Sequence, residues 1–503
     1  MASMTRRPLR AVALALGLAL TSACGGAASV AANSSPTPAP ARPAASAGAG
    51  ELTDWPEFGL NAQRGDATSQ PTGVTAAGVG TLKDRRVSLP GTVDSSPIYL
   101  HDVRVGRVSV DVVVVSTTYG RTIAINPASG KLLWTFTPPG YAGWAGSPQI
   151  TNSSPVADPD RRFVYAASPD GLIHKLQLAD GREDRTGAWP ARVTRDPVRE
   201  KLGSALNIDG PDVIATTSGY LGDTPTYQGH VALLSRATGR LVGVFNMLCA
   251  NRRSLLVPTT CGESDSAILS RGGAVVEPGG RRILVDTGNG DWNGTTDLGD
   301  SVVELTFPGL RLRQAYTPTN QAMLNAGDLD LGSSAPALLG HDRVLVAGKD
   351  AIMRVLDLAR LDGRPAAEPE QLGGELQTFP TPGGAEPFTQ PAVWTHDGQT
   401  SVFAADFSGT AAYTLTGGHL EPAWSNTTPG TSPILAGGLL YVYDPRAGGI
   451  DVYTPSSAQP IAKLAGTSGH WNSPIVVDGH VVEPEGNAND HLLTGTIDLF
   501  SAG

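Results

Sequence analysis

Positive charge is scarce in this 503-residue sequence. Lysine and arginine together number 37, against 47 aspartate and glutamate residues, which gives a formal net charge of −10 and a pI of about 5.4. The basic residues form no continuous stripe of the kind that tracks a phosphate backbone. The composition therefore argues against nucleic acid as a partner.

Helical periodicity and several enzyme motifs are absent as well. After the leader, no sustained apolar pattern repeats every 3.6 residues, so an all-β fold is favoured. The sequence has no Gly-x-Ser-x-Gly elbow, phosphate loop or His-Glu-x-x-His helix. Hydrolase and nucleotide-binding functions therefore lack support.

Cysteine is rare, with three residues in the whole chain. Cys24 lies in the leader, and Cys249 and Cys261 share one segment twelve positions apart. Metal ligation by this pair is disfavoured because no third cysteine or nearby histidine completes a site. In an exported protein the pair is expected to form a disulfide, which would stabilise the fold by roughly 3 kcal/mol in the chain-entropy model.

The sequence is rich in short repeated strand patterns and in turn-forming residues, with 61 glycines and 39 prolines. The clearest copy starts at Ser-Ser-Pro (95–97), continues through strands at 112–115 and 122–125, and ends at 132–134. Similar starts recur about every 54 residues, a spacing that fits a four-stranded propeller blade. The starts are near Pro97, Pro155, Ala205, Ala274, Pro336, Pro391, Pro433 and Pro474.

Eight starts predict an eight-bladed β-propeller, with seven blades as the alternative because the 205–274 interval is long. The last copy lacks a fourth strand, since the chain ends soon after 496–500. The segment 84–89 precedes the first copy and is expected to supply that strand, so N-terminal and C-terminal strands would pair and close the ring.

The first fifty residues read as an export signal and a tether. Arginines at 6, 7 and 10 precede an apolar run at 11–20 that is too short for a permanent membrane span, and small residues then lead to Cys24. This resembles a bacterial lipoprotein signal, in which the cysteine is lipidated. The expected organisation is a signal peptide (1–23), lipidated Cys24 with an Ala/Pro/Ser-rich linker (24–51), and a propeller (52–503). Secretion without an anchor, to the medium or periplasm, is the alternative.

The repeat itself resembles a known family. Asp-Trp-Pro-Glu-Phe-Gly at 54–59, the Ser-Ser-Pro start and Pro-Ala-Ser-Gly-Lys-Leu-Leu-Trp at 127–134 are similar to the PQQ-like, or quinoprotein-type, β-propeller repeat. The resemblance covers about 52–503. The family contains PQQ-dependent alcohol dehydrogenases and also the lipoprotein scaffold of the outer-membrane barrel-assembly machinery, so it implies a fold rather than one function.

Two segments resemble the dehydrogenases more closely. The stretch Thr-Gly-Asn-Gly-Asp-Trp-Asn at 287–293 implies that Asn289 binds a catalytic calcium, and Asp-Leu-Asp at 328–330 implies that Asp328 acts as the catalytic base. Other dehydrogenase features are missing: adjacent cysteines, an aromatic residue within 268–271, the glutamate that binds calcium, and a haem attachment motif. PQQ is therefore disfavoured as a cofactor.

The same loop also has the spacing of a calcium-binding loop. Its oxygen-bearing side chains fall at positions 1, 3, 5, 9 and 12 of that spacing, and carboxylate and amide oxygens suit Ca²⁺. The alternative is a hydrogen-bonded hairpin loop, because Asn, Asp and Gly also favour tight turns. The candidate metal ligands are Asn289, Asp291, Asn293, Asp297 and Asp300.

Together these observations predict an exported, lipid-anchored propeller that binds or scaffolds an envelope protein, or a small ligand, at one face. Its only membrane contact would be the lipid on Cys24. Calcium is the one cofactor that the sequence suggests, without establishing it. The alternative function is a PQQ- and calcium-dependent alcohol or sugar dehydrogenase with a divergent site.

Overall fold

The computed structural model describes residues 50–222, 226–363 and 372–503. The described residues belong to one compact unit, Ala49–Gly503. The expected signal peptide, Cys24 and the linker up to residue 49 therefore lie outside the described residues. Within the described ranges, no helix is both long and apolar enough to cross a bilayer.

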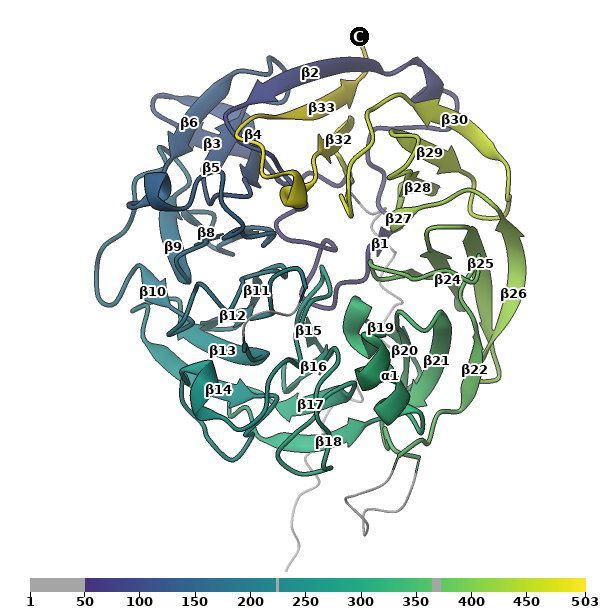
Figure 1. Cartoon of the computed structure of the whole chain (residues 1–503). Coiled ribbons are helices and arrows are strands. Elements are labelled where there is room, and N and C mark those ends of the chain that lie inside the picture. The colour runs from purple at the N-terminus through teal and green to yellow at the C-terminus, as the bar shows by residue number, and fades with distance from the viewer. Residues whose placement is uncertain (1–49, 223–225, 364–371) are drawn as a thin grey trace, which may run out of the picture. The chain divides into compact units, whose positions relative to one another are not determined.

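Eight antiparallel sheets of four strands form the described unit as an eight-bladed propeller, which confirms the predicted fold (Figure 1). The strand bounds of the first four blades, from the innermost strand outward, are as follows: β3 (Ile98–Val105), β4 (Val108–Ser116), β5 (Thr122–Ile125) and β6 (Leu132–Phe136) in blade 1; β7 (Val156–Ala157), β8 (Phe163–Ser168), β9 (Leu172–Gln177) and β10 (Ala191–Arg192) in blade 2; β11 (Asn207–Asp209), β12 (Asp212–Thr216), β13 (His230–Ser235) and β14 (Leu241–Asn246) in blade 3; β15 (Val275–Val276), β16 (Arg282–Asp286), β17 (Val302–Thr306) and β18 (Leu312–Tyr316) in blade 4.

The remaining blades follow the same order, with one extra strand, β1 (Ala67–Thr68), parallel to the innermost strand of blade 7. Their strands are β19 (Ser334–Gly340), β20 (Arg343–Ala347), β21 (Ile352–Asp357) and β22 (Gln377–Pro380) in blade 5; β23 (Ala392–His396), β24 (Gln399–Ala405), β25 (Thr410–Thr416) and β26 (His419–Asn426) in blade 6; β27 (Thr431–Ala436), β28 (Leu439–Tyr443), β29 (Ile450–Tyr453) and β30 (Pro460–Leu464) in blade 7; β31 (Ile475–Val477), β32 (His480–Glu485), β33 (Gly495–Ser501) and β2 (Lys83–Leu89) in blade 8.

Helix is limited to one short α-helix, α1 (Gln321–Gly327), and five 3₁₀ turns in the described part of the chain. The turns are η1 (Val79–Thr81), η2 (Tyr141–Gly143), η3 (Pro258–Thr260), η4 (Leu331–Ser333) and η5 (Ala488–Asp490). All of them lie in connections between strands.

The core lies between neighbouring blades, and β4 shows why the strands are apolar at successive residues. Side chains alternate between the two faces of a strand. Val113 and Val115 pack against blade 8, whereas Val112 and Val114 pack against blade 2. None of the four has any exposed surface. Each such side chain contributes about 1.5–3 kcal/mol when fully buried.

The ring closes as predicted. Strand β2 pairs along its full length with β33, so that the N-terminal strand becomes the outermost strand of the last blade. The guanidinium of Arg86 donates to both carboxylate oxygens of Asp498 at 2.8 and 2.7 Å and lies 3.2 Å from the carboxylate of Glu485. Both carboxylates are buried, so this cation neutralises charge inside the closing blade.

Each blade places its connections at two opposite ends of the ring. Because the strands alternate in direction, the connections entering the innermost strand and those between the second and third strands lie at the same end. This end is called the open face. The opposite end is called the plugged face, because the segment 52–68 runs across it, as the purple trace through the middle of Figure 1 shows.

This N-terminal segment is a structural element that the sequence did not reveal. Its backbone hydrogen-bonds to the innermost strands of five blades, through Tyr99, Ala157, Val276, Val393 and Leu435. A chain segment that contacts five blades fixes their relative positions at the ring centre.

Arg64 is the buried anchor of the segment, with 1% of its surface exposed. Its guanidinium donates to the carbonyl oxygens of Phe58 (2.7 Å), Leu206 (2.8 Å) and Gly272 (3.1 Å), and to the carboxylate of Glu57 (3.0 Å). One side chain thus joins the segment to blades 3 and 4.

Candidate functional site at the open face

A buried ionic network crosses the centre of the open face. Asp94 precedes the innermost strand of blade 1, Arg271 that of blade 4 and His470 that of blade 8. Arg271 Nη2 lies 2.6 Å from Asp94 Oδ1, and Nη1 donates to the Asp94 carbonyl oxygen at 2.8 Å. His470 Nδ1 lies 2.8 Å from Asp94 Oδ2. Three segments far apart in sequence therefore meet at one carboxylate.

The Asp94 carboxylate is fully satisfied by these and further contacts. Asn152 Nδ2 and the backbone N–H of Ala488 each donate to Oδ2 at 3.0 Å. Burial by itself would raise the pKa of Asp94, but the charges of Arg271 and His470 outweigh burial and hold the pKa below its ordinary value. Asp94 is therefore an ionised group whose hydrogen-bond and ion-pair partners are all groups of the protein.

A stack of three rings lies beside this network. The rings of Phe388 and Trp471 are 4.1 Å apart and inclined by 9°, and those of His470 and Trp471 are 4.1 Å apart and inclined by 21°. Two rings at that distance cannot share one face of the indole, so Trp471 is covered on both faces. The Arg271 guanidinium lies 5.2 Å from the same indole. These rings therefore pack on one another rather than awaiting a planar ligand.

A second polar group lies at the open face, between blades 4 and 5. The backbone N–H of Asn289 donates to Asp330 Oδ1 at 2.8 Å, and Lys349 Nζ lies 2.5 Å from Asp330 Oδ2. Burial raises the pKa of the Asp330 carboxyl, although Lys349 opposes that shift. No donor in the described part of the chain reaches the buried Asn289 Oδ1. The structure thus brings the predicted residue Asn289 together with Asp330.

Asp328, the predicted catalytic base, lies at the end of a helix and is exposed. It ends helix α1 in the left-handed conformation, with φ of 52°, and its side chain is 62% exposed. Its contact is Lys349 Nζ, 3.1 Å from Oδ1. Of the two carboxylates in the Asp-Leu-Asp segment, the second one, Asp330, is the buried one beside Asn289.

The predicted calcium loop forms a hairpin that is held by its own hydrogen bonds. Asn293 Oδ1 accepts from the backbone N–H groups of Thr295 (2.9 Å), Thr296 (2.9 Å) and Asp297 (3.1 Å). Trp292 and Leu298 pair across the base of the loop. This is the arrangement expected of the hairpin alternative.

The carboxylates of the loop turn toward separate partners. Asp297 Oδ1 accepts from the Cys249 backbone N–H at 3.0 Å, and Asp300 Oδ1 accepts from the Leu331 N–H at 3.1 Å. Burial raises the pKa of Asp300 to about 8. Asp291 lies next to Glu263 instead, and their mutual hydrogen bond raises the pKa of Glu263. Asp291, Asp297 and Asp300 do not form one cluster around a shared point among the described residues, and calcium binding by this loop stays a prediction.

The predicted disulfide between Cys249 and Cys261 is present, with the two Cα atoms 6.2 Å apart. It lies in the connection between β14 and β15. Its two cysteines are twelve positions apart in the sequence and are not adjacent. Because Cys249 also donates to Asp297, the disulfide loop and the 289–300 hairpin support each other.

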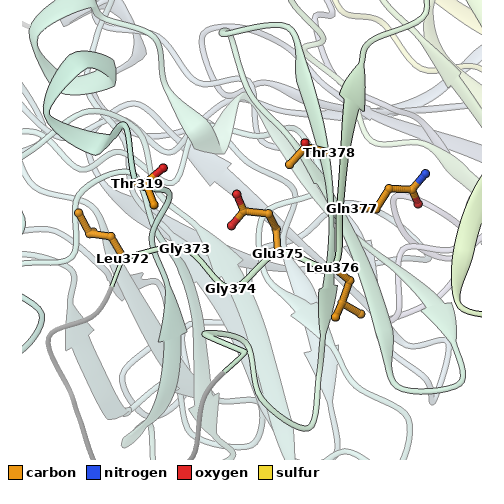
Figure 2. A pocket seen from close by; sticks show the side chains of 8 residues that line it. All are labelled: Thr319, Leu372, Gly373, Gly374, Glu375, Leu376, Gln377 and Thr378. Carbon is orange, nitrogen blue, oxygen red and sulfur yellow. The ribbon is translucent and has the colours of Figure 1, made fainter.

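A shallow pocket of about 370 Å³ opens at blade 5 (Figure 2). The Glu375 side chain lies between those of Thr319 and Thr378. Gly373 and Gly374 contribute only backbone to the lining. The Glu375 carboxylate accepts from the Tyr316 hydroxyl at 3.2 Å. None of the residues singled out from the sequence lines this pocket.

Large apolar side chains are exposed in open-face connections. These exposed residues lie between strands, in connections of blades 2 to 5 and blade 8: Val198, Leu221, Met323, Leu492 and Leu493. At the opposite end of the ring, the exposed apolar residues lie mainly on or beside outermost strands, and include Val242, Leu312 and Ile461. The open face therefore combines a satisfied polar centre with apolar loops around it.

One protein-family model matches part of the repeated region of the chain. The family model described as outer membrane protein assembly factor BamB matches residues 71–296. This match and the eight-bladed fold are consistent with a PQQ-like repeat family. No curated protein sequence matches the chain of this propeller.

Solved structures share the fold of this propeller at low sequence identity. The quinohemoprotein alcohol dehydrogenase from Comamonas testosteroni is 15% identical, with a TM-score of 0.63 over 90% of this chain and 81% of that one. A europium-containing methanol dehydrogenase is 14% identical, with a TM-score of 0.63 over 90% and 98%. BamB from Moraxella catarrhalis is 12% identical, with a TM-score of 0.52 over 84% and 100%. Enzymes and an assembly factor are thus both similar in fold.

Sequence reasoning missed the residues at the centre of the open face. Asp94 and Arg271 each lie four residues before an innermost strand, and His470 lies five residues before one. Aligning the repeats and noting charged residues just before each strand start is the signal that finds them. Lys349 follows β20 and gave no comparable signal.

Proposed function

We propose that this PQQ-like propeller is an extracytoplasmic binding protein that presents its open face to a protein partner as a rigid scaffold. The buried Asp94–Arg271 pair carries the proposal, because it joins blades 1 and 4 across the ring with groups of the protein itself. The plugged face is tied together by Arg64 and the segment 52–68. With both ends secured internally, the ring needs no cofactor to hold its shape.

The residues present do not fit a planar quinone. The stretch 268–271 has no aromatic side chain, and its Arg271 is committed to Asp94. The two cysteines form a disulfide across a twelve-residue separation instead of an adjacent pair. Trp471 has both faces covered by rings of the protein. We therefore derive no reaction step through PQQ.

The cation part of a dehydrogenase site fits only in part. Asn289 Oδ1 and the Asp330 carboxylate offer oxygen donors of the kind that calcium prefers. However, the Lys349 ammonium already contacts Asp330 and Asp328 and neutralises charge there. A calcium ion would have to displace this ammonium, which disfavours the dehydrogenase function and a calcium-stabilised variant of the scaffold.

Titration with PQQ separates these alternatives. We expect calorimetry to detect no binding of PQQ to the purified protein, either with excess Ca²⁺ or with a chelator, because Arg271 is paired with Asp94 and both faces of Trp471 are covered by rings of the protein. Asn289→Ala should behave like the unaltered protein. Calcium-dependent binding of one PQQ per chain, abolished by Asn289→Ala, would contradict the proposal and establish the dehydrogenase alternative.

The proposed location is the extracytoplasmic side of a bacterial membrane. A disulfide is typical of oxidising compartments, which agrees with export. The family model and one similar structure carry the name of an outer membrane assembly factor, which supports a scaffold role. Lipid attachment through Cys24 would hold the propeller at the membrane, with the linker up to residue 51 as a spacer.

Photo-crosslinking tests the scaffold role directly. A photoreactive residue in place of Met323 or Leu492, both about half-exposed on the open face, should capture the same protein partner in cells. The matched controls carry the photoreactive residue at Val242 or Ile461, which are similarly exposed at the opposite end. Crosslinks from the controls alone, or equally from both ends, would contradict docking at the open face.

A further inference from the structure

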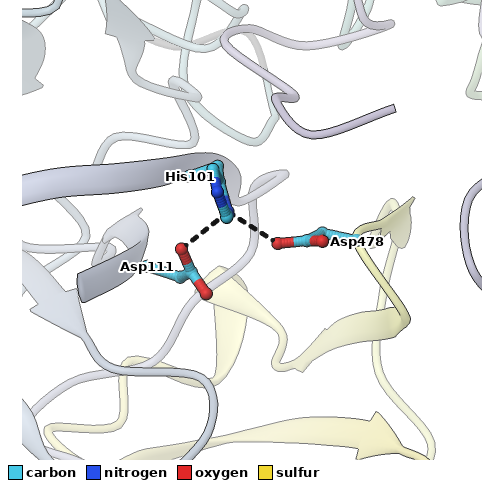
Figure 3. A group of neighbouring side chains, drawn as sticks. All are labelled: His101, Asp111 and Asp478. Atoms are coloured by element: carbon cyan, nitrogen blue, oxygen red, sulfur yellow. Dashed lines mark hydrogen bonds and ion pairs between the residues drawn. The ribbon is translucent and has the colours of Figure 1, made fainter. Parts of the chain in front are cut away.

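A histidine and two aspartates converge at the plugged face, on the seam where the ring closes. Figure 3 shows the His101 ring between the two carboxylates. Its Nδ1 lies 2.9 Å from Asp111 Oδ1 and 3.0 Å from Asp478 Oδ2. All three ligand atoms lie within 4.8 Å of one another, and no other group of three such residues does so in the described ranges.

Local backbone features bring these side chains together. The register of β3 on β4 shifts between Leu100 and Val103, which leaves His101 in a bulge opposite Asp111. Asp478 forms the tight turn between β31 and β32, and its backbone N–H donates to the Leu52 carbonyl oxygen at 3.1 Å. The cluster therefore joins blade 1 to blade 8.

The neighbouring groups orient the carboxylates, and in the described part of the chain no lysine or arginine forms an ion pair with either of them, which leaves His101 as their partner. The buried Tyr99 hydroxyl donates to Asp478 Oδ2 at 2.9 Å, and the Asp102 backbone N–H donates to Asp111 Oδ1 at 2.9 Å. The nearby guanidinium of Arg161 is bonded to Asp54 and to the His101 carbonyl oxygen. A neutral imidazole has a single proton to offer two carboxylates through this one nitrogen.

We propose that these three residues bind one divalent transition-metal ion of the zinc class. A divalent metal ion in place of the shared proton would bind the imidazole nitrogen and both carboxylate oxygens at once. Its two positive charges would neutralise the two carboxylates. An imidazole nitrogen with two carboxylates is a ligand set suited to Zn²⁺, whereas Ca²⁺ prefers oxygen alone. Since the side chains are partly exposed, water completes the coordination. Tyr99 holds Asp478 in place, as outer partners of metal ligands commonly do.

The ion would act as a staple on the closing seam. It would connect the bulge of β3, the facing part of β4 and the β31–β32 turn, which belong to the first and last blades. An ion that binds the folded state alone raises the apparent stability in proportion to the logarithm of its concentration. The site is distinct from Asn289 and Asp330, which lie on the open face.

Titration of the purified protein with ZnCl₂ tests this proposal, by calorimetry and by thermal unfolding. We expect one Zn²⁺ per chain, unaffected by excess Ca²⁺, and a melting temperature that rises with Zn²⁺ concentration. His101→Ala and Asp478→Asn should each weaken binding at least tenfold and remove the Zn²⁺-dependent rise. Circular dichroism checks that each variant is folded.

The matched control is His396→Ala. His396 is an exposed histidine on blade 6 that faces a single carboxylate, Asp397, at 3.4 Å. This variant should bind Zn²⁺ like the unaltered protein. Absence of Zn²⁺ binding in the unaltered protein would overturn the proposal. Equal binding by the His101→Ala and Asp478→Asn variants, with loss in His396→Ala, would place the ion elsewhere and would also overturn it.

Discussion

Replacing Arg64 by methionine should lower the free energy of unfolding by about 3–5 kcal/mol, the range observed when one partner of a buried ion pair is removed. Methionine fills much of the same volume but donates no hydrogen bonds. The carbonyl oxygens of Phe58, Leu206 and Gly272 would lose their donor, and the Glu57 carboxylate would lose its cation. The segment 52–68 would then no longer be held against blades 3 and 4.

This loss should depend on pH in a defined direction. Burial raises the pKa of Glu57 from 4.5 to about 7 and that of Asp66, which also faces Arg64, from 3.8 to about 8. For a carboxyl whose folded-state pKa is raised, the stability from the neutral form is complete below its unfolded pKa and is lost as the pH rises through the folded value. Without Arg64 the ionised forms lack a counter-charge, so the loss should be larger at pH 8.5 than at pH 5.

Urea unfolding of the Arg64→Met variant at both pH values measures this difference. The control is Arg107→Met, at an exposed arginine in the turn between β3 and β4, which should change stability by less than about 0.5 kcal/mol. A loss below about 1 kcal/mol for Arg64→Met at pH 8.5 would show that the plugged face does not depend on this side chain.

Cys24→Ala should transfer the protein from the membrane fraction to the soluble fraction. Each buried methylene of a lipid chain contributes about 0.8 kcal/mol to membrane binding, and more than one chain is needed for stable anchoring. The run 11–20 is too short to replace such an anchor as a permanent span. Fractionation of cells followed by immunodetection measures the change, which is expected to be nearly complete.

If the leader of the Cys24→Ala variant were not cleaved, it could itself keep the protein at the membrane. A second variant removes this complication. Replacing residues 1–24 with an ordinary cleavable secretion signal leaves the linker and the propeller intact. This variant should also be soluble, and the disulfide between Cys249 and Cys261 should still form. If both variants sedimented with membranes, Cys24 would not be the anchor, and the propeller or its partner would be holding the protein at the membrane.

The strand pattern was readable from the sequence because each blade repeats the same local pattern. The predicted starts near Pro97, Pro336 and Pro474 lie at β3, β19 and β31, and the segment 84–89 falls within β2. The interval that left seven blades open, 205–274, is long because it contains the disulfide loop and a long connection between β12 and β13. It nevertheless holds one four-stranded sheet, so the count is eight.

The candidate sites were less predictable, because side-chain direction does not follow from spacing. Asp328 and Asp330 are two positions apart, yet the left-handed end of α1 leaves the first exposed, and the second is buried against Lys349. In the 289–300 loop, Asp297 and Asp300 have the spacing of a calcium loop but bond to backbone groups of other segments. A linear spacing rule could not anticipate those competing partners.

The sequence by itself determined the repeated four-stranded blade, the strand that closes the ring and the disulfide, since these follow from local patterns. It favoured eight blades over seven, and the structure decided that count. Only the tertiary structure decided which polar residues meet. Asp94 and Arg271 are 177 positions apart, and Asp94 and His470 are 376 apart. His101 and Asp478 likewise meet because the first and last blades are neighbours. Folding of the chain into a closed ring creates such contacts. A local pattern can mark a residue as a candidate, but it does not show which residues pair.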